Sequence, residues 1–284
     1  MSFLSSRFEY RAALALNNMA ITMMERRCYR QAFETFKDAV AAMKVARLSV
    51  EKADDSSERE SVLGFLRKAN QRSFRPNASR SVQAWTVVSH NCGHLEWILP
   101  SFEASSSPKD NNNNSSSNNN NIMMHFYLIR LDDADIFGSD DEELLQCDVL
   151  TIIMLYNFGM SYLCRAQTTS STSAASKFRQ GALKLLTLCR NLLAVQYESC
   201  EDLFVLPRLW YLSAIILQTL RQAFLVSGNV QDAMDCARVL QSLEQAAATS
   251  TNDAAATTSS SLSSSDMFAL LIKDTTRAHA AAAA

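Results

Sequence analysis

Apolar residues recur every three or four positions along two stretches near the start of the chain, the spacing typical of amphipathic helices. The first stretch covers residues 8–25 and the second residues 29–48, and charged Arg26 and Arg27 separate them. Two such helices joined by a short charged bend form an antiparallel hairpin. The pattern therefore predicts a first helical hairpin over residues 7–50.

The same periodicity returns twice in the second half of the chain, within residues 123–246. A second hairpin is predicted around a long Ser/Thr/Ala bend at 168–176, and a third around Ser227, Gly228 and Asn229. Gly228 suits the left-handed conformation that ends a helix, and Asn229 suits the start of the next one. The predicted helices are 144–165 with 177–195, and 208–226 with 231–243. The expected fold class is mainly α, built from antiparallel helical hairpins.

Three short segments predict extended structure instead. Residues 83–89 and 125–131 are rich in β-branched and aromatic side chains and are bounded by polar sequence. The apolar run 267–272 is a third candidate strand, although a run of this length is equally compatible with a short helix. We hypothesise that these strands pair as a small accessory sheet that caps the helices.

Low-complexity sequence interrupts the predicted hairpins. Residues 111–121 consist entirely of Asn and Ser, a composition that cannot form a core. The sequence therefore predicts a largely disordered linker over 51–122. It also predicts a low-complexity tail with one short apolar segment over 247–284.

The overall composition narrows the range of partners and compartments. With 27 Lys and Arg against 29 Asp and Glu, the net charge of -2 provides no field that would attract nucleic acid or an anionic membrane. The longest apolar run, 209–217, is about half of what a membrane crossing needs. Seven widely spread cysteines are an odd number and indicate a reducing compartment. We expect a cytoplasmic protein, with the nucleus as the alternative.

The sequence contains no recognisable catalytic or cofactor-binding motif. It has no phosphate-binding glycine loop, nucleophile elbow or dinucleotide fingerprint. His90, Cys92 and His94 are three potential zinc ligands, but no fourth ligand follows nearby, so we favour structural or solvated roles. A Cys/His pair such as Cys92 with His125 is the enzymatic alternative. We predict a protein that is not an enzyme and takes no metal, cofactor or small-molecule substrate.

The first hairpin resembles a tetratricopeptide repeat (TPR), whose pattern places small and aromatic residues at fixed positions of two paired helices. In the first hairpin these positions hold Ala20, Tyr29, Ala32, Phe36 and Ala39. The second hairpin repeats the pattern at Gly159, Tyr162, Ala182, Leu186 and Cys189, and the third at Leu220, Phe224, Gly228 and Ala233. The third departs from the pattern at Arg221 and Ala237. A helical bundle without repeats is the alternative.

The resemblance implies a groove, lined by the first helix of each hairpin, that binds a peptide or a partner helix. Carried over residue by residue, the expected partner-binding positions are Asn17, Ile21, Met24, Glu25, Tyr156, Met160, Gln218, Gln222 and Leu225. These positions lack a pair of cations, so we expect an apolar or amide-rich protein or peptide partner rather than an acidic tail. The alternatives are a structural subunit of a helical homo- or hetero-oligomer and an enzyme without a recognisable motif.

Overall fold

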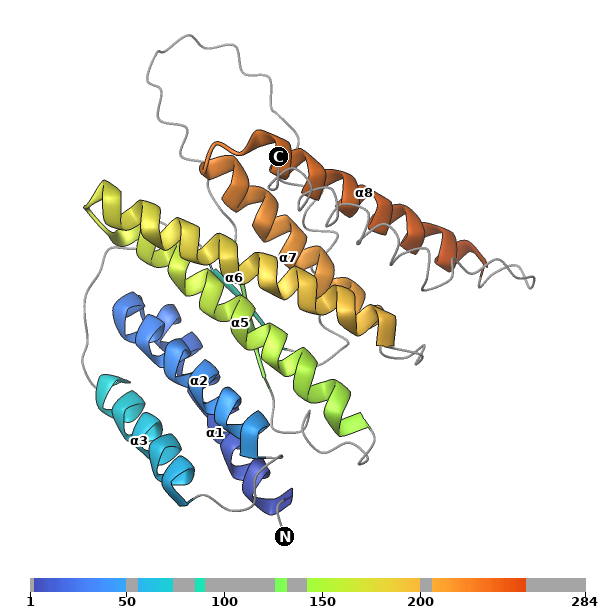
Figure 1. Cartoon of the computed structure of the whole chain (residues 1–284). Coiled ribbons are helices and arrows are strands. Elements are labelled where there is room, and N and C mark those ends of the chain that lie inside the picture. The colour runs from blue at the N-terminus through green and yellow to red at the C-terminus, as the bar shows by residue number, and fades with distance from the viewer. Residues whose placement is uncertain are drawn as a thin grey trace, which may run out of the picture.

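The computed structural model of the chain describes residues 3–49, 56–73, 85–89, 126–131, 142–199 and 206–253 (Figure 1). The prediction of a mainly α protein is confirmed, because helices account for 90% of the residues whose structure can be interpreted. The elements are α1 (Phe3–Glu25), α2 (Tyr29–Ser49), α3 (Ser56–Ser73), β1 (Trp85–Ser89), β2 (Phe126–Arg130), α5 (Glu142–Thr168), α6 (Thr172–Ser199), α7 (Leu206–Val226) and α8 (Val230–Asp253).

The helices pack as antiparallel pairs, α1 with α2, α5 with α6, and α7 with α8. Contacts of α2 with α5 and of α6 with α7 join the three hairpins into one row (Figure 1). Neighbouring first helices also touch each other, α1 with α5 and α5 with α7, whereas the described parts of the second helices contact each other little or not at all. The helices α1, α5 and α7 therefore share one face of the row.

The first and third hairpins turn in the same way. In the third, Gly228 has a φ of 81°, as predicted, and the N–H of Asn229 donates to the Phe224 carbonyl at 2.9 Å. In the first, Arg27 takes the left-handed position with a φ of 62°, and the N–H of Cys28 donates to the Met23 carbonyl at 2.8 Å. Both turns satisfy carbonyls that the helix end leaves free.

The long bend predicted in the second hairpin is wrong, because only residues 169–171 separate α5 from α6. The Ser/Thr/Ala segment lengthens both helices instead. The hydroxyl of Thr169 donates to the Arg165 carbonyl at 2.6 Å and covers the end of α5. The carbonyl of Ser171 accepts the N–H of Ala175 at 2.9 Å as α6 begins. Local capping therefore makes a longer loop unnecessary.

Helix α3 lies within the stretch 51–122, which the sequence predicted to be largely disordered, so that expectation is corrected over residues 56–73. The helix packs against both α1 and α2 and buries Val62 and Ala69 completely. Arg72 of α3 donates to Asp38 of α2 at 2.6 Å, between side chains that are mostly shielded from solvent. The helix covers the first hairpin at the end of the row opposite to α5. Tertiary packing thus stabilises a helix whose own apolar content is low.

Two of the expected strands are present. They pair only with each other, as a two-stranded parallel ribbon, and do not form the expected sheet that caps the helices. Trp85 is paired with Phe126, and the register continues to Ser89 with Arg130. In Figure 1 the ribbon lies behind α5 and α6. The third expected strand, 267–272, falls outside the described residues.

Helix α5 is the central helix of the row. By length and composition its residues Asp148–Thr168 could cross a membrane. However, 83% of the most apolar stretch within them is buried inside the protein. Helices α2, α6 and α7 and strand β2 all contact α5. The packing of these elements accounts for its apolar character.

Candidate functional site

Strand β2 lies along α1 and α5, on the face that the first helices of the hairpins form. Its side chains are enclosed there, since Leu128 and Ile129 are fully buried and the adjoining Leu131 is 1% exposed. The face at which the sequence predicts a peptide groove thus holds an extended segment of the same chain.

Asn157 of α5 anchors the middle of this segment through its backbone. The side-chain oxygen of Asn157 accepts the N–H of Ile129 at 3.0 Å, and its Nδ2 donates to the carbonyl of Ile129 at 2.8 Å. The second hydrogen of Nδ2 goes to Asn17 Oδ1 at 3.0 Å. Asn157 is completely buried, and these bonds use both hydrogens of its amide nitrogen.

Asn18 of α1 makes the same pair of bonds two residues further along the segment. Its Oδ1 accepts the N–H of Leu131 at 3.0 Å, and its Nδ2 donates to the carbonyl of Leu131 at 2.5 Å. Asn17 connects the two anchors by donating to Asn18 Oδ1 at 3.3 Å. Three amides from two hairpins therefore form one chain of hydrogen bonds along the strand.

Tyr156 ties the segment to the third hairpin as well. Its hydroxyl donates to the carbonyl of Tyr127 at 3.0 Å and lies 3.3 Å from the Thr219 hydroxyl of α7. Burial raises the pKa of the Tyr156 phenol well above its usual value, an effect that the hydrogen bond with Thr219 only partly opposes. Tyr156 therefore stays protonated at neutral pH and acts as a hydrogen-bond donor.

Asn18 and Asn157, which anchor the segment, and Thr219, which lies beside Tyr156, were not predicted from the sequence, although a signal for them exists. Asn18 stands two residues before the small residue Ala20, and Asn157 stands two residues before Gly159. Thr219 has the same position relative to Arg221, which replaces that small residue in the third hairpin. Alignment of the three hairpins on this position would have shown that it carries Asn, Asn and Thr.

The structure divides the predicted partner-binding residues into a filled part and an open part. In the filled part, on α1 and α5, Asn17, Ile21, Met24, Tyr156 and Met160 are all completely buried. In the open part, on α7, Leu225 is 39% exposed and Gln218 and Gln222 are half-buried. The buried Oε1 of Gln222 has no hydrogen-bond partner among the described residues.

Glu25, the remaining predicted residue, contacts the segment through its side chain. The guanidinium of Arg130 donates to Glu25 Oε2 at 3.2 Å, and both side chains are partly exposed. A hollow of about 320 Å³ lies beside Arg130. Its lining residues come from α1, the turn after it and β2: Ala15, Asn18, Met19, Thr22, Met23, Arg26 and Arg130.

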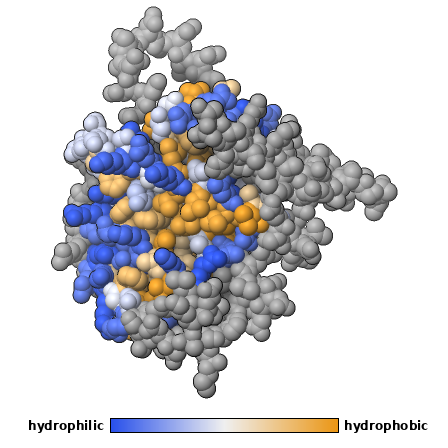
Figure 2. All heavy atoms as spheres, viewed as in Figure 1, coloured by the Kyte–Doolittle hydropathy of each residue, from blue (hydrophilic) through white to orange (hydrophobic). Residues whose placement is uncertain are grey.

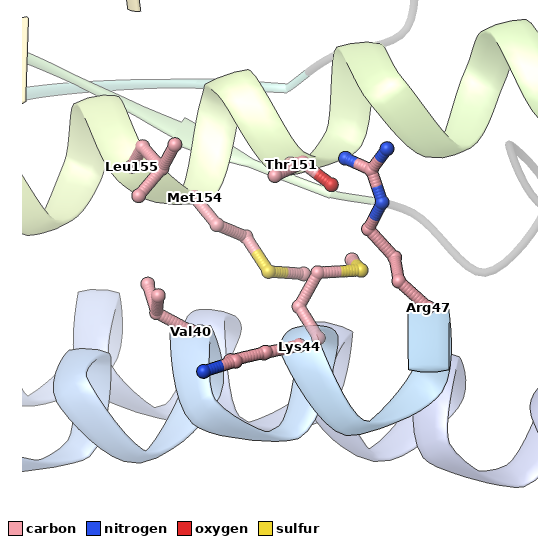
Figure 3. Close-up of a pocket in the computed structure, with 7 residues that line it drawn as sticks. Val40, Lys44, Arg47, Thr151, Met154 and Leu155 are labelled. Atoms are coloured by element: carbon pink, nitrogen blue, oxygen red, sulfur yellow. The ribbon is translucent and has the colours of Figure 1, made fainter. Parts of the chain in front are cut away.

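A second hollow, of about 310 Å³, opens between α2 and α5 (Figure 3). Met154 points into it from α5 and Val40 from α2, and Lys44 lies along its floor. Arg47 reaches from α2 toward α5, where its Nη1 lies 2.9 Å from Asp148 Oδ1. The wall is mainly apolar, so this hollow suits an apolar side chain better than a polar ligand.

The described residues contain no group of three or more His, Cys, Asp or Glu side chains placed to hold a metal ion. His90, Cys92 and His94, and the alternative nucleophile pair of Cys92 with His125, lie outside the described residues. Four cysteines within them, Cys28, Cys164, Cys189 and Cys236, are free and buried. Burial raises the pKa of Cys164 and of Cys189, which keeps both thiols protonated.

The sequence matches no protein-family model, and neither a comparison with curated proteins nor one with solved structures gives a significant match.

Proposed function

We propose that this chain is a non-enzymatic protein–protein interaction scaffold that holds an extended polypeptide on the face formed by α1, α5 and α7. One observation carries the proposal. Asn18 and Asn157, at equivalent positions of two hairpins, each bind both backbone polar groups of one residue in an extended segment.

Backbone recognition of this kind suits a peptide-binding groove. An extended chain directs the N–H and C=O groups of alternate residues to the same side, and the bound residues Ile129 and Leu131 are alternate residues. A side-chain amide presents one acceptor and one donor close together, so it pairs with both groups at once. The contacts depend on extended conformation and not on side-chain identity, which leaves specificity to the surrounding apolar surface.

The internal packing supports a TPR-like array. Ala20, Ala32, Phe36 and Ala39, which carry the resemblance, are all completely buried. Gly159 allows close approach of the paired helix, because a Cβ there would lie 3.3 Å from the Leu186 side chain. Such small residues let the helices of a hairpin come close enough for their aromatic residues to fill the remaining space.

The open part of the groove is where a partner first makes contact. Leu225 supplies apolar surface, and the amides of Gln218 and Gln222 supply donors and acceptors. The Gln222 Oε1 without a hydrogen-bond partner would accept a bond from a partner N–H after rotation of the side chain. We therefore expect a partner segment with apolar or amide side chains, inside a reducing compartment that keeps the buried cysteines free.

Affinity capture with mass spectrometry tests this proposal through matched variants. The double variant Gln222→Arg with Leu225→Arg should lose the partners that the natural chain retains, because it places two charges on the open part. Lys184→Glu on α6, an exposed position, is the control and should retain them. A set of partners that the double variant leaves unchanged would contradict the groove assignment.

A structural subunit is the second candidate, and the surface of α6 favours it. Figure 2 shows hydrophobic surface gathered over the middle of the molecule, where Figure 1 places α5, α6 and α7. Leu188 is 43% exposed and Val195 is 55% exposed on α6. Size-exclusion chromatography with light scattering distinguishes the candidates: a subunit should form an oligomer that Leu188→Ser with Val195→Ser dissociates, whereas a scaffold with a free groove should be monomeric.

A further inference from the structure

Strand β2 occupies the groove through contacts that a segment from another protein could also make. The four hydrogen bonds that Asn18 and Asn157 make with the segment involve only the backbone of Ile129 and Leu131. The fifth, from the Tyr156 hydroxyl, goes to the backbone carbonyl of Tyr127. These five hydrogen bonds between the helices and the segment are thus independent of the side chains of the segment.

The side chains of the segment define which other segments would fit. Leu128, Ile129 and Leu131 fill apolar space on the face, and among residues 128–131 Arg130 alone is polar. Arg130 extends to Glu25 at the rim, where an opposite charge is favourable and a like charge is not. A matching segment is extended and carries apolar residues at the positions of Leu128, Ile129 and Leu131. It has Lys or Arg at the position of Arg130.

We propose that β2 is an intramolecular ligand of the groove and that an extended partner segment with this apolar–apolar–basic–apolar pattern replaces it. The inference rests on the proposed peptide-binding function and adds to it the class of partner and a means of regulation. The entering segment makes the same backbone bonds to Asn18, Asn157 and Tyr156, takes the place of β2 beside β1, and buries similar apolar surface.

Tethering gives the internal segment the advantage in this competition. A segment on the same chain competes at an effective concentration in the millimolar range, whereas a separate peptide competes only at its own concentration. A free peptide should therefore bind the natural chain weakly. Any change that weakens the internal segment, and leaves the groove intact, should strengthen binding of the free peptide.

The experiment uses a fluorescent synthetic peptide with the sequence of residues 124–133, titrated against the full chain by anisotropy. Ile129→Pro removes the N–H that Asn157 binds and should strengthen peptide binding by about tenfold or more. Arg130→Glu places a like charge beside Glu25 and should strengthen it by about two- to fivefold, without loss of a core side chain. Lys184→Glu makes the same charge change on α6 and should leave the affinity unchanged.

Hydrogen exchange on the natural chain gives a measurement that does not depend on a variant that folds. The free peptide is synthesised with heavy-isotope leucine so that its fragments differ in mass from those of the chain. In excess peptide, the amides of Ile129 and Leu131 in the chain should lose protection, while α1 and α5 keep theirs.

Two results would overturn the inference and leave the proposed function standing. In the first, the peptide binds the natural chain and both strand variants equally, with no loss of protection in β2. In the second, no folded variant binds the peptide, but in the affinity-capture experiment the double variant Gln222→Arg with Leu225→Arg still loses the partners of the natural chain. Failure of the peptide and of the capture experiment together would remove both proposals.

Discussion

The filled and the open parts of the proposed groove differ at one repeated position. On α1 and α5 that position is Asn, and an extended segment lies against both helices. On α7 it is Thr219, whose hydroxyl donates to the Ile215 carbonyl at 2.9 Å and lies 3.3 Å from the Tyr156 hydroxyl. A hydroxyl that is already engaged cannot pair with both polar groups of a peptide unit, whereas an amide can. The side-chain chemistry at this position therefore separates the part that holds the strand from the part left open.

Removal of the central anchor should produce the largest effect. Asn157→Ala leaves the N–H and carbonyl of Ile129 and the oxygen of Asn17 buried without partners. We expect a loss of about 3 kcal/mol in the free energy of unfolding, measured by chemical denaturation. Asn18→Ala should cost less, about 1 kcal/mol, because water can reach its half-buried site. Equal costs for the two variants would contradict a segment anchored mainly at Asn157.

Loss of the phenol that joins both parts should have an intermediate effect. Tyr156→Phe removes the bond to the Tyr127 carbonyl and should cost about 1–2 kcal/mol at pH 7. The raised pKa of Tyr156 means that its neutral form is favoured in the folded protein. Its contribution is therefore complete below the usual tyrosine pKa of about 10 and is lost as the pH rises above that value.

Denaturation measured across alkaline pH checks the sign of this linkage. The natural chain should lose stability between about pH 10 and 11 more steeply than Tyr156→Phe does. Identical slopes for the two proteins would show that Tyr156 is not shielded as the structure indicates.

Neutralising the rim of the filled part should have only a small effect. Glu25→Gln removes the ion pair with Arg130, whose side chains are 42% and 33% exposed respectively. We expect a change of about 0.5 kcal/mol or less, which added salt should abolish. Glu60→Gln is the matched control, because its pair with Arg67 on α3 is more exposed and should contribute still less. A larger cost for Glu60→Gln would contradict this ranking.

Changes in the open part should affect stability least of all. Gln222→Ala and Leu225→Ala should each leave the free energy of unfolding within about 0.5 kcal/mol of the natural value, since neither side chain anchors the strand. Thermal denaturation checks this expectation. A cost near that of Asn157→Ala would show that the two parts of the groove do not differ as described.

Much of the local structure could be predicted from the sequence, because helix periodicity, turn residues and β-branched runs act over a few neighbouring positions. The three hairpins, the left-handed Gly228 and the extended segment 126–130 all follow from such signals. Arg27 gave no comparable signal, since an arginine at positive φ is uncommon and the packing of α1 on α2 imposes it. Helix α3 was missed for a similar reason, because its stability depends on the surfaces of α1 and α2.

The site shows the same division between local and distant information. The sequence by itself determined which residues form the first helices, and the TPR resemblance predicted that Asn17, Tyr156 and Gln222 belong to one face. Only the tertiary structure placed residues 126–131 on that face, because the anchors and the strand lie far apart along the chain, 113 residues in the case of Asn18 and Leu131. Stacking of the hairpins fixes the distance between Asn18 and Asn157. A local sequence pattern carries no information about that distance.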